Sequence, residues 1–125
     1  MDKGARENSM RPSILIIEPR REVAAALEDV VNSANYIAVV MPHLERLTDL
    51  RITPAAIIVR VTFETASEPA HSFIERMLSD RPPVVAIAWE DADMVEAARL
   101  KCDVVLRAPG DVSRLCAALS HVVHA

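Results

Sequence analysis

Residues 13–18 read SILIIE, which is a serine, four consecutive apolar residues and then a carboxylate. A short apolar run rich in isoleucine is typical of a strand that is buried on both faces. Three more runs have the same form, over residues 56–59, 84–88 and 104–106. Because strands buried on both faces belong mainly to parallel α/β sheets, these runs predict such a sheet.

Between the runs the apolar spacing changes to three or four residues, which predicts amphipathic helices. The chain thus predicts five strands, with residues 36–41 as the second, alternating with five helices. The helices are expected over residues 20–34, 42–50, 73–78, 93–101 and 111–123. Asp93 followed by Glu96 predicts the start of the fourth helix, and Asp111 is expected to cap the fifth. This alternation favours right-handed crossovers and a flavodoxin-like three-layer sandwich with strand order 2-1-3-4-5.

Length and composition agree with one globular domain. The chain has 125 residues, half of them apolar, and a net charge of −4. We expect a disordered segment over residues 1–12 and a domain over 13–125. The acidic balance argues against a nucleic-acid partner, and no apolar run approaches the roughly 20 residues of a membrane helix. Cys102 and Cys116 match no metal or redox spacing, which favours reduced thiols and a cytoplasmic location.

Few of the usual ligand-binding motifs are present. Gly4 and Gly110 are the only glycines, so neither a dinucleotide fingerprint nor a phosphate-binding loop can be built. There is no nucleophile elbow, and the four histidines are scattered. We therefore expect no cofactor, no metal and no catalytic residue.

The sequence nevertheless resembles the receiver domains of two-component response regulators, over about residues 13–121. The resemblance rests on ILIIE at 14–18, PVVAI at 83–87 and LRAP at 106–109. It implies six functional positions: two metal-binding acids, a phospho-accepting aspartate, a hydroxyl residue, a lysine and a switch aromatic. The residues that stand there are, in that order, Glu18, Pro19, Arg60, Ala88, Ala108 and Val105. Only Glu18 keeps the expected charge, so the resemblance implies a degenerate receiver, or pseudo-receiver.

Arg60 carries the main chemical consequence. An acyl phosphate needs a carboxylate nucleophile, which a guanidinium cannot supply. A single carboxylate is also a poor magnesium site, and a nearby cation weakens it further. We therefore expect no enzymatic phosphoryl transfer. Because the first and third strands are neighbours, Arg60 is predicted to face Glu18 as a fixed ion pair. The alternative is that Arg60 extends into solvent.

These features favour phosphorylation-independent binding of another protein. The resemblance implies a histidine kinase, an output protein or a second copy of the chain as partner. Trp89, Met94 and Val105 are the candidate interaction surface, because the helix after residue 90 is apolar over a wider arc than burial requires. An alternative is an anion sensor, in which Arg20, Arg60 and Arg107 converge at the sheet edge.

A third, enzymatic interpretation uses the acids Glu90, Asp91 and Asp93. We favour helix capping for these three residues, because acids are stabilising at a helix start.

Overall fold

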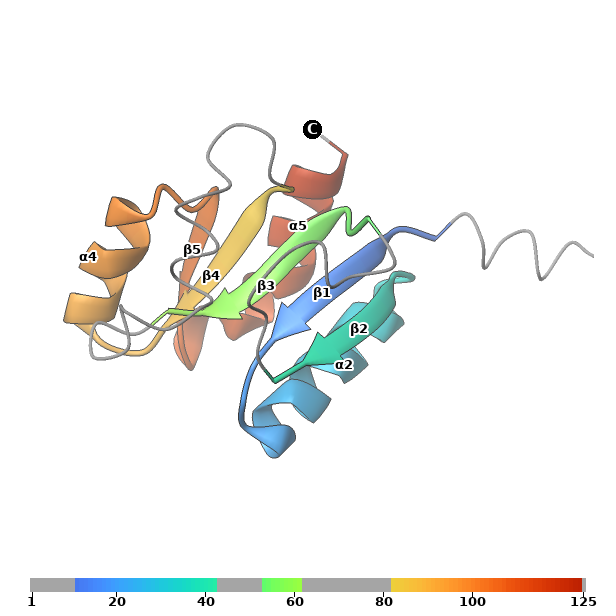
Figure 1. Ribbon diagram of the computed structural model, residues 1–125, viewed down its shortest axis with the longest axis horizontal. Coiled ribbons are helices and arrows are strands. Elements are labelled where there is room, and N and C mark those ends of the chain that lie inside the picture. Colours follow the sequence, from blue (N-terminus) through green and yellow to red (C-terminus); the bar gives the residue numbers. More distant parts are fainter. Residues whose placement is uncertain (1–10, 43–52, 62–81, 125) are drawn as a thin grey trace, which may run out of the picture.

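The computed structural model describes residues 11–42, 53–61 and 82–124, which contain a five-stranded parallel sheet (Figure 1). The strands are β1 (Ser13–Ile17), β2 (Ile37–Met41), β3 (Ala56–Arg60), β4 (Val84–Ala88) and β5 (Val104–Arg107). Their spatial order is β2-β1-β3-β4-β5, so the predicted fold class and strand order are confirmed. The predicted bounds of β1 and β4 are reproduced, β2 and β5 differ by one residue at one end, and β3 is one residue shorter at each end than the strand predicted over 55–61.

The register determines which side chains share a face. Ile17 lies opposite Val59, and Arg60 lies opposite Ile87. Since Glu18 and Arg60 directly follow the Ile17–Val59 pair, they come next to each other at the end of the β1–β3 ladder. Glu18 also donates its backbone N–H to Met41 O at 3.1 Å, which extends the pairing with β2 to this residue.

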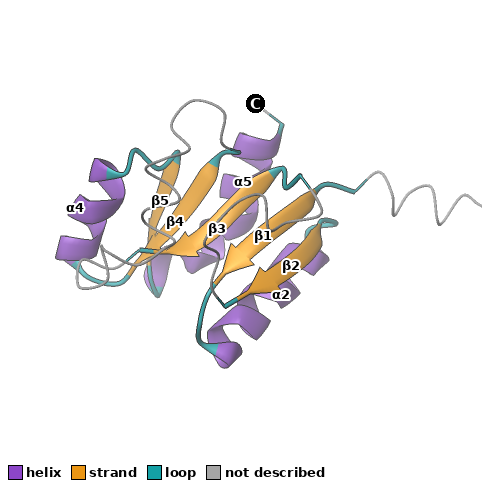
Figure 2. Cartoon of the chain, in the orientation of Figure 1, coloured by secondary structure: helices purple, strands orange, loops and turns teal. Residues whose placement is uncertain are grey.

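Helices cover both faces of the sheet (Figure 2). They are α2 (Arg21–Ser33), α4 (Asp91–Arg99), the 3-10 helix η2 (Gly110–Arg114) and α5 (Leu115–Val123). The predicted last helix is thus divided into a 3-10 turn and an α-helix. Asp111 does not cap it, because its carboxylate accepts the Arg107 N–H at 3.1 Å instead. The helices predicted over 42–50 and 73–78 lie outside the described residues, as do residues 1–10.

Each face has its own apolar core. Leu27 of α2 and Leu119 of α5 pack on one face, against side chains such as Ile16 and Ile58. Ala97 and Leu100, from α4 and its C-terminal end, belong to the core of the other face. The strand residues of both cores are almost completely inaccessible to solvent. This double burial explains why the strands read as continuous apolar runs rather than alternating ones.

Helix α4 begins two residues earlier than predicted. Its N-cap is Glu90, and Asp93 occupies the third helical position, where its carboxylate accepts the Glu90 N–H at 3.1 Å. The expected pairing of Asp93 with Glu96 is therefore wrong by one turn. Glu96 instead binds Arg99 through two hydrogen bonds, of 2.9 and 2.6 Å. The capping pattern fits either acid pair in the sequence, Glu90 with Asp93 or Asp93 with Glu96, and the helix uses the earlier one.

The turns after α2 and α4 each contain a residue with a positive φ value. Asn35 and Lys101, which follow α2 and α4, have positive φ values of 71° and 57°. Residues in the left-handed conformation commonly end helices, and asparagine adopts that conformation more readily than lysine does.

Asp103 links the start of β5 to β4, because its carboxylate accepts the Val84 N–H at 2.7 Å. In the described part of the chain, no helix is long and apolar enough to span a membrane.

Candidate functional site

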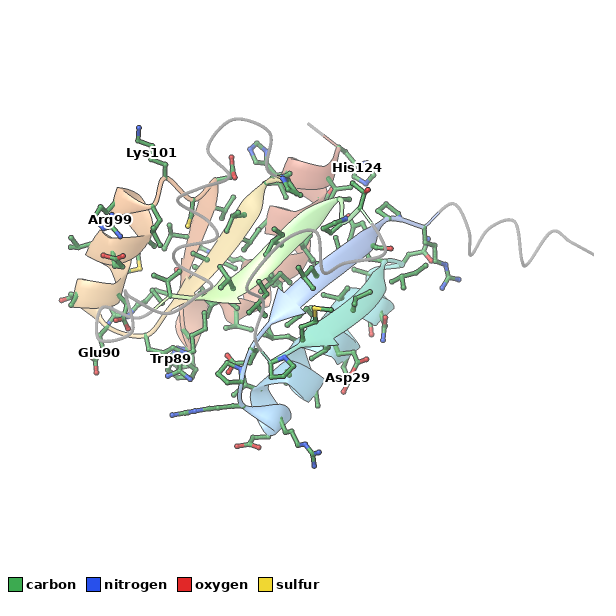
Figure 3. All side chains as sticks on the ribbon, in the orientation of Figure 1. Asp29, Trp89, Glu90, Arg99, Lys101 and His124 are labelled. Atoms are coloured by element: carbon green, nitrogen blue, oxygen red, sulfur yellow. The ribbon has the colours of Figure 1, made fainter. Side chains whose placement is uncertain are left out.

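The candidate site lies at the carboxyl ends of the strands, where the connections to the next elements begin (Figure 1). In open parallel sheets this edge is where ligands are bound. Glu18 follows β1, Arg60 ends β3, Trp89 follows β4 and Ala108 follows β5. Figure 3 shows Trp89 at this edge, close to the start of α4.

Glu18 is buried, with 3% of its surface exposed. Its Oε2 atom accepts the backbone N–H of Arg20 at 2.9 Å, across the turn that leads into α2. A backbone donor of this kind stabilises a carboxylate and fixes its direction. The carboxylate therefore also has a structural role in the turn between β1 and α2.

Arg60 does not form the predicted ion pair. Within the described ranges no salt bridge joins it to Glu18; its guanidinium lies over the indole of Trp89, with Cζ 5.7 Å from the ring centroid. The alternative of full exposure is also wrong, because Arg60 is only partly exposed. Since Arg60 lies opposite Ile87, Trp89 is its diagonal neighbour, two residues further along β4 on the same face.

The stacked position of Arg60 carries an energetic cost. Its Nε atom is buried and has no hydrogen-bond partner. A cation over an indole is stabilising by about 0.5–2 kcal/mol, whereas an unsatisfied buried donor costs about 1–3 kcal/mol. The two effects are of similar size. The contact with Trp89 therefore contributes little net stabilisation. In this position the guanidinium forms no ion pair with Glu18.

The remaining receiver-like positions carry no reactive group. Ala88 and Ala108 are buried, and the Ala108 N–H donates to Ala88 O at 2.7 Å, which joins the ends of β4 and β5. The Ala108–Pro109 peptide bond is cis. Pro19 is exposed and has no acidic side chain to offer. These positions thus supply neither a hydroxyl nor an ammonium group to the site.

The arginines of the alternative anion site are not all free. Arg107 forms an ion pair with Asp91, with Nη1 2.6 Å from Oδ1, at the first residue of α4. Arg60 covers Trp89, and Arg20 is exposed after β1. Two of the three guanidinium groups are therefore engaged by neighbouring side chains.

The acids at the start of α4 have structural contacts: Glu90 and Asp93 form its N-terminal cap, and Asp91 pairs with Arg107. Asp93 is buried and accepts the Glu90 N–H, and Asp91 is exposed and bound to Arg107. Across residues 11–42, 53–61 and 82–124, no group of three histidine, cysteine or acidic side chains is close enough to hold a metal ion.

The candidate interaction surface is spread over several elements. Trp89 is 37% exposed at the sheet edge, and Val95 on α4 is 70% exposed. Met94 is partly buried, and Val105 of β5 packs against the core beneath α4. Exposure of Val95 and Ala98 confirms that α4 is apolar over more than its buried side.

Comparison with known proteins supports the fold. No family model matches the chain, and no curated protein sequence is similar to it. Among solved structures, it is similar to a response regulator receiver protein from Burkholderia phymatum, with a TM-score of 0.74, 16% identity and coverage of 91% of this chain and 96% of the other. It also resembles a sensor protein from Polaromonas sp. JS666, with a TM-score of 0.72, 20% identity and coverage of 91% and 97%.

A third similar structure is the BeF3-activated N-terminal receiver domain of RstA from Klebsiella pneumoniae. Its TM-score is 0.70 at 15% identity, over 90% of this chain and 99% of that domain. The chain therefore has the CheY-like receiver fold, and the resemblance inferred from its sequence is confirmed at the level of fold.

One contact of the site was not predicted from the sequence. The sequence predicts an interface anchor at Trp89 and does not indicate its contact with Arg60. The signal was available, because the strand runs ending at Arg60 and Trp89 are neighbours in the predicted order. The two-residue offset between them along the strands, however, is set by the register of β3 and β4, in which Arg60 lies opposite Ile87.

Proposed function

We propose that the chain is an atypical receiver domain, which acts in cytoplasmic signal transduction by binding a protein partner without being phosphorylated. The observation that supports this most strongly is the position of Arg60. It ends the central strand of a receiver fold with a guanidinium that donates hydrogen bonds and accepts none. Such a group cannot form an acyl phosphate.

The surrounding positions support the same proposal. Glu18 is the carboxylate at the end of β1, and one of its oxygens already accepts the Arg20 N–H. Ala88 and Ala108 replace the polar groups that the resemblance implies at β4 and β5. Coordination of magnesium and proton transfer at this edge would both lack suitable side chains.

We place the docking face on the exposed apolar side of α4 and the adjoining sheet edge. Val95 is the most exposed large apolar residue of the described chain, and Trp89, which is 37% exposed, directly precedes the N-cap of α4. Exposed aromatic and aliphatic side chains are typical anchors of protein interfaces. A histidine kinase, an output protein or a second copy of the chain would fit this surface.

The docking proposal predicts a partner that is lost on removal of Trp89 and Val95. The tagged chain would be cross-linked in lysate of its host, in parallel with Trp89→Ala/Val95→Ala and with Asp29→Asn as a control on exposed α2. We expect one protein to be recovered with the wild type and the control, and to be at least about tenfold depleted with the double variant.

Each sample would also be prepared with and without acetyl phosphate and Mg²⁺. The proposal requires equal recovery under both conditions, measured by quantitative mass spectrometry. Recovery that depends on the phosphodonor, or that is unaffected by the double substitution, would contradict it.

A further inference from the structure

Glu18 and Arg60 are neighbours on adjacent strands, and they do not form an ion pair. Glu18 and Arg60 follow the register pair Ile17–Val59 on adjacent strands, so both side chains leave the sheet on the same face. Neighbouring strands are about 4.8 Å apart, a distance that an arginine side chain easily crosses. No ion pair within the described part of the chain engages Glu18.

In its observed position, Arg60 has one hydrogen-bond donor without an acceptor. Its guanidinium gains the face of Trp89, but its Nε–H is buried without an acceptor. In a second position, beside Glu18, the guanidinium can donate two hydrogen bonds to the carboxylate, but it no longer contacts the indole. Each position satisfies a group that the other leaves unsatisfied.

We infer that Arg60 is a two-position side chain, which alternates between the Trp89 indole and the Glu18 carboxylate. Movement to Glu18 uncovers the face of Trp89 that the guanidinium now occupies. The switch is internal to the chain and needs no phosphoryl group. That it controls docking rests on the proposed function, whereas the two positions themselves do not.

Trp89 is the only tryptophan of the chain, so its fluorescence reports on this contact without a label. The full-length chain would be compared with Arg60→Met, which cannot place a cation on the ring. Glu18→Gln is the test variant, because it keeps an oxygen for the Arg20 N–H but removes the charge that attracts Arg60. Asp29→Asn makes the same change of charge on the exposed side of α2 and serves as the control (Figure 3).

We expect the wild-type emission to lie between that of Arg60→Met and that of Glu18→Gln, and the control to match the wild type. Wild-type emission equal to that of Glu18→Gln would overturn the inference, because Arg60 would then have a single position.

Nitrogen-15 relaxation of the Arg60 Nε–H gives a second readout that does not need the Glu18 variant to fold. The order parameter is expected below about 0.6 in the wild type, which is the flexible range, and it should rise in Glu18→Gln. An Nε–H in the wild type that is rigid and also shows no relaxation dispersion, the signature of slower exchange, would refute the two positions, whether or not the chain has a docking partner.

Discussion

Replacing Ile58 by alanine is expected to lower the free energy of unfolding by about 2–5 kcal/mol. Ile58 is completely buried in the middle of β3, opposite Ile16 of β1 and Val85 of β4. Truncation removes apolar contacts and leaves a cavity that a paired central strand cannot close. Urea denaturation, monitored by circular dichroism, measures the difference.

Val95→Ala is the matched control, because it also shortens a branched apolar side chain but at a site that is 70% exposed. Its effect is expected to be within about 0.5 kcal/mol. A small effect of Ile58→Ala would show that the described double-sided core does not hold the sheet together. Equal losses in both variants would point to the same conclusion.

Replacing Arg60 by aspartate is expected to lower the free energy of unfolding by about 3 kcal/mol. The new carboxylate would stand beside Glu18 on the same face, and two like charges about 5 Å apart repel by that amount at an effective dielectric constant near 20. The cation over Trp89 would be lost in addition. The thermal midpoint of unfolding, compared with that of the wild type, measures the loss.

Arg60→Gln separates the two causes, because it removes the cation without adding a negative charge. Its effect is expected to be clearly smaller. Two adjacent carboxylates also form a better cation site than one does, so Mg²⁺ should recover part of the stability of Arg60→Asp and none of that of Arg60→Gln. Equal stability of both variants, with no response to Mg²⁺, would show that residue 60 does not face Glu18.

Much of the fold follows from local sequence. The continuous apolar runs and the alternation with helical periods determine β1 to β5 and their order, because burial on both faces leaves few other arrangements. The helix termini are less well determined. Around α4, Glu90, Asp93 and Glu96 offer acids at two successive three-residue spacings, and only the packing of the helix on the sheet decides between them.

The candidate site, like the fold, could be predicted from the sequence only in part. The loss of reactive groups at Arg60, Ala88 and Ala108 can be read from the sequence once the strand ends are known. The direction of a long side chain cannot be read in this way, since Arg60 has an acid beside it on β1 and an indole diagonally ahead on β4. The observed stack on Trp89 depends on the register between β3 and β4, which no residue pattern specifies.

The absence of a phospho-acceptor is tested most directly by titration of the nitrogen-15-labelled chain with beryllofluoride and Mg²⁺, followed by amide NMR. Beryllofluoride mimics a phosphoryl group on a carboxylate nucleophile, and we predict no saturable shift at Glu18, Arg60 or Ala88. Saturable, magnesium-dependent shifts centred on these residues would contradict it, because they would reveal a working acceptor at the edge of the sheet.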